Sequence, residues 1–272
     1  MNPEEYEVMY CVEDTHWWYL GMERITRAVL DRAIGRGRSL RILDAGCGTG
    51  AVMGYLSDYG TVTGFDFAAE ALHFCRVRQR DRLSRASVLA LPYADESFDL
   101  LTSFDVLCER AVVDDDLALR EFARVLRSPD AVSGKPGGRV LLRLPAYNWL
   151  HGQHDEAVYI RHRYTARELK HKLRQAGFEP KHVSYANMLL FPAAVIKRAS
   201  ERFMPIKQQG SDLTIGTGLL NTPMRLILSA EAPFVARTGL PFGLTVIALG
   251  QRMVSPNGHM RCSAPVNGYA AR

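Results

Sequence analysis

Three glycines at alternate positions follow a short apolar run, in the stretch that reads RILDAGCGTG from Arg41 to Gly50. The apolar run predicts a buried strand, and glycines after it allow positive φ angles and a close approach of a ligand to the backbone. A parallel sheet binds its ligands at the carboxyl ends of its strands, where the strand order reverses. The stretch therefore predicts an α/β sheet with a ligand site after its first strand.

Strand-like and helix-like segments alternate from Leu40 to about Pro145. The expected strands are LRILDAG, TVTGFD, ASVLALP, FDLLTSFDVL and GGRVLLRLPA, and the helices between them include AAEALHFCRVRQRDRL and DDDLALREFARVL. Such alternation indicates a mostly parallel sheet covered on both faces. Further on, the capping box Thr165–Glu168 opens the helix TARELKHKLRQAG, and EPKHVSYAN and GLTVIALGQRM are two more strands.

Three ligands can use a glycine loop at this place. A Walker loop needs a Gly-Lys-Ser/Thr sequence, and no lysine follows here. A dinucleotide fingerprint is GxGxxG, which is one residue longer than the GxGxG of this loop. S-adenosylmethionine remains. Asp66 ends the second strand, at the same edge of the sheet as the glycine loop.

The motifs DAGCGTG, GFDFA, LALPYADESFDLLTSFDVL, REFARVL and PGGRVLL occur in this order within residues 40–145. This stretch resembles the class I S-adenosylmethionine-dependent methyltransferases. The resemblance implies a Rossmann-like, doubly wound, mostly parallel seven-stranded sheet. It also implies S-adenosylmethionine as cofactor, S-adenosylhomocysteine as product and no metal. The cofactor-binding residues that it implies are Asp44, Gly46, Gly48, Gly50, Asp66, Phe67, Val88, Leu89, Phe104 and Asp105. At Asp66 it implies a carboxylate that accepts hydrogen bonds from both ribose hydroxyls.

Two positions depart from the family pattern. Ser87 replaces an acid that contacts the adenine amino group in many relatives, so we expect the backbone at Val88 and Leu89 to hold adenine. Glu109 replaces a histidine in the SFDVLCE stretch after the fourth strand.

The segment EDTHWWYLGMERITRAVL resembles the HWW-x-x-G-x-R opening of a bacterial branch of this superfamily. One hypothesis is that His16, either Trp17 or Trp18, and Arg24 complete the cofactor pocket, because aromatic faces attract a cation such as a sulfonium. The alternative is that the tryptophans are core contacts of the first helix.

The segment LPAYNWLHGQHDEAVYIRHRYT follows the fifth strand, on the side where we expect the acceptor. His154 is the predicted general base, oriented by Asp155. Arg163 either binds an anionic acceptor group or caps a helix. The predicted acceptor-binding residues are Tyr10, His16, Glu109, His151, Arg163 and Tyr164.

We expect five parts along the chain, which are listed here by residue number. They are an N-terminal helical lid (1–39), the cofactor-binding core (40–187), a helical insertion that caps the acceptor (188–238), the last core strand (239–254) and a tail (255–272). The stretch MLLFPAAVIKRASERFM within the insertion is consistent with a lid over an apolar acceptor, a surface for peripheral membrane contact or a dimer contact.

These observations favour methyl transfer to a small-molecule acceptor by in-line displacement. Alternatives are a lipid-linked glycan, protein or RNA acceptor, and a non-methylating enzyme such as a cyclase. The net charge of +5 comes without an RNA-binding motif, so we expect no nucleic acid partner. The acidic N-terminus and five scattered cysteines favour a reducing, cytoplasmic setting. The sequence is compatible with a monomer or a homodimer.

Overall fold

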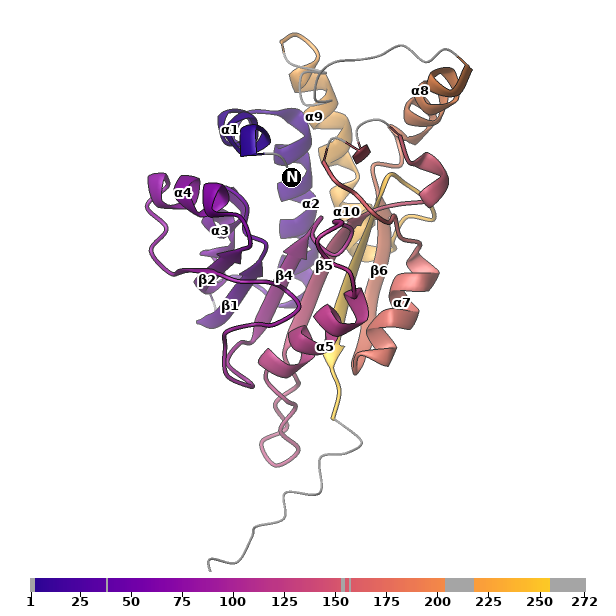
Figure 1. Cartoon of the computed structure of the whole chain (residues 1–272). Coiled ribbons are helices and arrows are strands. Elements are labelled where there is room, and N and C mark those ends of the chain that lie inside the picture. Colours follow the sequence, from indigo (N-terminus) through magenta and orange to yellow (C-terminus); the bar gives the residue numbers. More distant parts are fainter. Residues whose placement is uncertain (1–2, 38, 153–154, 157, 204–217, 255–272) are drawn as a thin grey trace, which may run out of the picture.

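The computed structural model describes residues 3–37, 39–152, 155–156, 158–203 and 218–254. One seven-stranded sheet forms the centre, in the order β3-β2-β1-β4-β5-β7-β6 (Figure 1). The first five strands pair in parallel, and β7 runs antiparallel between β5 and β6. The predicted mostly parallel, Rossmann-like sheet is thereby confirmed. The strands are β1 (Leu40–Ala45), β2 (Gly60–Asp66), β3 (Leu83–Arg85), β4 (Leu100–Phe104), β5 (Arg139–Pro145), β6 (Phe178–Ala186) and β7 (Thr245–Arg252).

Helices cover both faces of this sheet and bury a separate apolar cluster on each (Figure 1). The cluster under α5 and α7 includes Phe122 and Leu173, and the cluster under α2, α9 and α10 includes Ile25 and Val235. The helices are α1 (Pro3–Val12), α2 (Trp17–Ala33), α3 (Ala51–Leu56), α4 (Ala69–Val77), α5 (Asp115–Val125), α7 (Ala166–Gln175), α8 (Phe191–Phe203), α9 (Asn221–Ala230) and α10 (Ala232–Arg237), with a short 3₁₀ turn η1 (Asn148–Leu150).

The caps that the sequence predicted are present. Thr165 accepts a hydrogen bond from the backbone N–H of Glu168 at 3.2 Å, and the Glu168 side chain completes the capping box. Gly177, just beyond α7, has a φ of 85°, which glycine adopts without strain. These contacts explain why the helix begins and ends where the sequence indicated.

The third strand lies elsewhere than predicted. The expected strand ASVLALP, residues 86–92, is a bent segment in which Ser87 and Ala90 form an isolated bridge, and β3 is the shorter run before it. Val88 and Leu91 are apolar because they are buried in the core cluster under α5, not because they belong to a strand. The helix before β3 also ends earlier than expected, at Val77, and Gln79 has a φ of 59°.

The insertion is helical where the structure describes it, and part of it extends the layer formed by α2. A Cβ atom on Gly21 of α2 would lie 2.5 Å from Leu228 of α9, so the two helices approach closely. Asn221, at the start of α9, accepts a hydrogen bond from the N–H of Trp17 at 2.7 Å and donates one to the carbonyl of Thr15 at 2.9 Å. The predicted tail and residues 204–217 lie outside the described residues.

No helix among the described residues is both long enough and apolar enough to span a membrane.

Candidate functional site

The glycine loop leaves the carboxyl end of β1 in a conformation that only glycine adopts readily. Gly46, Gly48 and Gly50 have φ angles of 79°, 52° and 87°. A Cβ atom on Gly46 would lie 2.2 Å from a methyl carbon of Val106, so no larger residue fits there. The loop therefore brings bare backbone to the carboxyl edge of the sheet, as the sequence predicted.

Asp66 ends β2 and is tied to this loop. Its carboxylate accepts hydrogen bonds from the N–H of Gly48 at 3.0 Å and of Ala68 at 2.9 Å. Burial raises the pKa of Asp66, and the backbone N–H groups partly offset this shift. The structure thus brings together the acid and the loop that were assigned to one ligand, while the side chain of Phe67 beside them is exposed.

Asp44, the last acidic residue before the loop, has one oxygen without a partner. Its Oδ1 atom accepts a hydrogen bond from Thr102 at 2.7 Å, and its Oδ2 atom is buried with no hydrogen bond from any described residue. Burial raises the pKa of Asp44 to about 7, against the lowering effects of Thr102 and of the Arg143 charge. Buried polar atoms without a partner are uncommon, so this atom fits a site that a cationic ligand group completes.

In the segment after β3, fewer backbone N–H groups are available to a ligand than the sequence suggested. The side chain of Val88 is buried in the core cluster. The N–H of Leu89, a predicted adenine contact, donates to the hydroxyl of Ser87 at 3.2 Å.

Helix α1 lies over the glycine loop, since a Cβ atom on Gly48 would lie 3.0 Å from Cε of Met9. Tyr10 of α1 stacks on Phe74 of α4, with ring centres 4.9 Å apart, and the guanidinium of Arg78 lies 4.7 Å from the same ring. The ring of Tyr10, which was predicted to bind the acceptor, therefore packs against Phe74 of α4. Tyr6, which sequence reasoning missed, is buried, and its pKa is raised by burial and by the charges of Asp66 and Glu109.

The three predicted cofactor residues of the HWW segment have different surroundings. His16 is buried and accepts a hydrogen bond from the N–H of Trp18 at 3.3 Å, so it caps α2. The ring of Trp18 lies 5.1 Å from the guanidinium carbon of Arg143. Arg24 is exposed and lies off the buried face of α2, and its role in the cofactor pocket stays a prediction.

Beyond β5, most of the predicted acceptor residues are engaged with the protein itself. Asp155 is buried, and its Oδ1 atom accepts from Arg163 at 2.7 and 3.1 Å, while its Oδ2 atom accepts from the N–H of Gly152. Tyr164 is buried and donates a hydrogen bond to Asp115 at 2.6 Å. His151 contacts the carbonyl of Ile160 at 3.3 Å.

These contacts change the expected roles in this region. The two oxygens of Asp155 are used by Arg163 and Gly152, which leaves the carboxylate little capacity to orient a neighbouring imidazole. His154, the predicted base, lies outside the described residues. Glu109 has a half-buried carboxyl whose pKa is raised to about 7, first by burial and then by the charges of Asp66 and Asp105.

Carboxylates that could hold a metal ion gather at Asp114, Asp115 and Asp116. Asp114 caps α5 through the N–H of Leu117, and Lys172 contacts the other two at 3.0 and 2.9 Å. Hydrogen bonds and ion pairs within the protein therefore already compensate these carboxylates.

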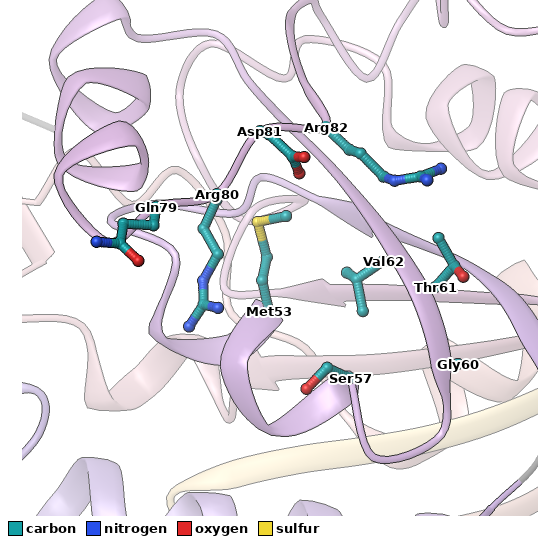
Figure 2. Close-up of a pocket in the computed structure, with 9 residues that line it drawn as sticks. All are labelled: Met53, Ser57, Gly60, Thr61, Val62, Gln79, Arg80, Asp81 and Arg82. Atoms are coloured by element: carbon teal, nitrogen blue, oxygen red, sulfur yellow. The ribbon is translucent and has the colours of Figure 1, made fainter.

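A cavity of about 230 Å³ lies between α3, the start of β2 and the link from α4 to β3 (Figure 2). Gly60 and Thr61 line it, at the end of β2 opposite to Asp66. Six strand residues span about 20 Å, so this side of the cavity lies far from Asp66, while Arg80 on its other side contacts the carbonyl of Gly50 at 3.4 Å. It is not the site that the loop and Asp66 form.

Comparison with known proteins agrees with this geometry. A family described as "Methyltransferase domain" matches residues 43–132. Methyltransferase GfsG of Streptomyces halstedii is 34% identical over 130 residues, covering 44% of this chain and 42% of its own length. The demethylmenaquinone methyltransferase of Lactiplantibacillus plantarum is 30% identical over 205 residues, covering 62% of this chain and 82% of its own length.

A solved SAM-dependent methyltransferase from Thermotoga maritima shares the fold, with a TM-score of 0.55 and 18% identity over 92% of this chain and 95% of its own. The chain spans less than half the length of the first curated relatives that it matches, at 42% and 49%. The match to most of the Lactiplantibacillus protein and the strand order of the sheet nevertheless agree. The chain therefore belongs to the class I S-adenosylmethionine-dependent methyltransferases.

Proposed function

We propose that this chain transfers the methyl group of S-adenosylmethionine to a small-molecule acceptor. The observation that carries the proposal is the glycine loop held by Asp66 through the N–H of Gly48, beside the unpartnered oxygen of Asp44. The names of the relatives support a small acceptor, since several of them are demethylmenaquinone methyltransferases.

When bound, S-adenosylmethionine would supply a sulfonium methyl group for in-line attack by the acceptor, with S-adenosylhomocysteine as the leaving group. Asp66 would accept hydrogen bonds from the ribose hydroxyls, and Val88 and Leu89 would flank adenine. Asp44 would face the methionine ammonium. Phe104 and Asp105 end β4 and would bound the pocket beside the methionine part.

The N-terminal helices would exclude water from this pocket. Tyr6 lies on α1, which covers the loop, Trp18 lies on α2 beside Arg143, and neither side chain is fully exposed. Water exclusion protects a reactive methyl donor and strengthens electrostatic contacts inside the site.

Proton removal from the acceptor has two candidate groups. His154 remains the base predicted from the sequence, with Asp155 beside it in the chain. Glu109 is the candidate that the described residues favour, because a half-buried carboxyl with a pKa of about 7 can accept a proton near neutral pH. The acceptor-cap role of residues 188–238 and the division of the chain into five parts remain predictions.

Incubation with methyl-tritiated S-adenosylmethionine and a short-chain demethylmenaquinone, kept as its quinol by a chemical reductant, tests the proposal. The expected result is label in the solvent-extracted quinone together with an equal amount of S-adenosylhomocysteine. Label in acid-precipitated protein or RNA, when purified macromolecules replace the quinone, would favour the alternative acceptors. Binding of the cofactor without label in any acceptor class would contradict methyl transfer and favour the non-methylating alternative.

A further inference from the structure

Arg143 is a largely buried cation in the sheet, and the sequence analysis did not assign it to a site. It lies in β5, is 8% exposed, and donates hydrogen bonds from Nε and Nη2 to Oδ2 of Asp105 at 3.0 and 2.9 Å. Its guanidinium carbon lies 4.5 Å from the ring of Phe104 and 5.1 Å from the ring of Trp18. Two aromatic rings and one carboxylate therefore hold the guanidinium in a defined orientation.

The guanidinium keeps donors that no described residue uses. A guanidinium has five N–H groups, and the hydrogen bonds to Asp105 use Nε and Nη2. No described residue accepts a hydrogen bond from Nη1 of Arg143. A nearly buried charge with unused donors is costly unless another partner meets it.

Arg143 shares a face of the sheet with Asp44. Asp44 is in register with Thr102, and Arg143 is in register with Phe104, two residues further along β4. Side chains two residues apart in a strand point to the same face. The charge of Arg143 lowers the pKa of Asp44, against the larger effect of burial, which shows that the two groups are close enough to interact.

The sheet order fixes which end of the cofactor would reach these residues. Val88 follows β3 and Asp66 ends β2, so the adenine and ribose would lie over this side of the sheet. The methionine part would then extend past β1 toward β4 and β5. It ends in an ammonium and a carboxylate, and the chain presents there an unpartnered acidic oxygen and an arginine with unused donors.

We infer that Arg143 binds the carboxylate of the methionine part of S-adenosylmethionine, while Asp44 binds its ammonium. The inference rests on the proposed function, because it requires this cofactor in the site. Asp105, Trp18 and Phe104 position the guanidinium. Arg24, which the sequence suggested for the cofactor pocket, is exposed, whereas Arg143 is largely buried.

Calorimetric binding of three ligands tests the inference without any acceptor. The ligands are S-adenosylhomocysteine, its decarboxylated analogue and 5′-methylthioadenosine, which lacks the whole amino acid end. In the unmodified protein, loss of the carboxylate should weaken binding about tenfold or more, as expected for a charge-assisted hydrogen bond.

In Arg143→Met, S-adenosylhomocysteine should lose about the same factor, whereas the decarboxylated analogue and 5′-methylthioadenosine should bind as before. Arg143→Lys should recover part of the loss, and Arg41→Met is the control, since Arg41 pairs with Asp99 at the exposed start of β1. Equal weakening of all three ligands in Arg143→Met, or no weakening, would overturn the inference.

If Arg143→Met does not fold, the affinities of the unmodified protein for the three ligands still test the inference. Equal affinity for S-adenosylhomocysteine and its decarboxylated analogue would overturn the inference and leave the proposed function intact. Failure to bind any of the three ligands would instead contradict the proposed function.

Discussion

Thr49, inside the glycine loop, donates a hydrogen bond to the buried carboxylate of Glu13, which directly follows α1. Arg78, which follows α4, donates to the same carboxylate at 2.9 Å and to that of Asp14 at 2.8 Å. Through these contacts the end of α1 is fastened to the loop that we assign to the cofactor.

Glu13→Gln should loosen this attachment. It removes a buried charge that faces Arg78, so we expect a loss of about 1–3 kcal/mol in the free energy of unfolding, measured with urea. S-adenosylhomocysteine binding should weaken as well. Asp14→Asn is the matched control, because the Asp14 side chain is 60% exposed and its pair with Arg78 should contribute about 0–1 kcal/mol. Equal losses in the two variants would contradict the attachment.

Gly21→Ala should separate α2 from α9. The new methyl group would lie 2.5–2.9 Å from three atoms of Leu228, a cost of about 1–3 kcal/mol by overpacking. Gly54→Ala in α3 is the control, because its nearest neighbour is the end of the Arg80 side chain, which can move. Leu228→Ala should relieve the clash, so the double variant should lose less stability than the sum of the two single variants.

Asp115 should stabilise the fold at neutral pH and lose that effect in acid. Burial acts to raise its pKa, but the hydrogen bonds from Tyr164 and Lys172 outweigh burial and lower it. An acid with a lowered folded pKa contributes stability above its unfolded pKa of about 3.9, and this stability is lost as the pH falls through the folded value.

Asp115→Asn should therefore cost about 1–3 kcal/mol at pH near 7 and progressively less in acid, as measured by urea unfolding across pH. Tyr164→Phe should show part of the same loss, because it removes only the hydroxyl. An identical cost of Asp115→Asn at neutral and at strongly acidic pH would contradict this explanation.

Asp44 should make cofactor binding depend on pH around 7. Its folded pKa of about 7 means that the carboxyl is largely protonated at lower pH, and an ammonium ligand favours the ionised form. Binding should strengthen as the pH rises through this value, and calorimetry in buffers of different ionisation enthalpy should detect proton release below it.

The stability of the ligand-free protein should fall over the pH range in which cofactor binding strengthens. An acid with a raised folded pKa contributes stability below its unfolded pKa of about 4, and this stability is lost as the pH rises through the folded value. Asp44→Asn should abolish the proton release on binding and reduce the loss of stability at higher pH. Glu109→Gln is the control, because that carboxyl also has a pKa raised to about 7. Unchanged proton release in Asp44→Asn would assign the effect to another group.

Most of the fold was predictable because the strands β1, β4 and β5 are largely buried on both faces and are therefore mostly apolar. The prediction of the third strand was wrong because apolar residues also occur in buried segments that are not strands. Val88 and Leu91 are apolar through core packing, whereas β3 itself, with the sequence LSR, lies at the sheet edge and has no apolar run.

The cofactor loop was predictable from neighbouring residues, but pairing between distant residues was not. Arg143 lies within an apolar strand, and only the register of β4 against β5 brings it to Asp105. Asp155 and Arg163 each looked like a group free for an acceptor, and the fold pairs them with each other. Tyr6 gave no motif, and only the placement of α1 over the loop brings it near Asp66.

Calorimetric titration of S-adenosylhomocysteine into the unmodified protein and into Asp66→Ala tests the central claim most directly. We predict one ligand per chain in the unmodified protein. In Asp66→Ala we predict an affinity about tenfold or more weaker, because the hydrogen bonds from two ribose hydroxyls to a carboxylate are lost. Absence of binding to the unmodified protein, or equal affinity of the two proteins, would contradict the assignment of the glycine loop and Asp66 to this cofactor.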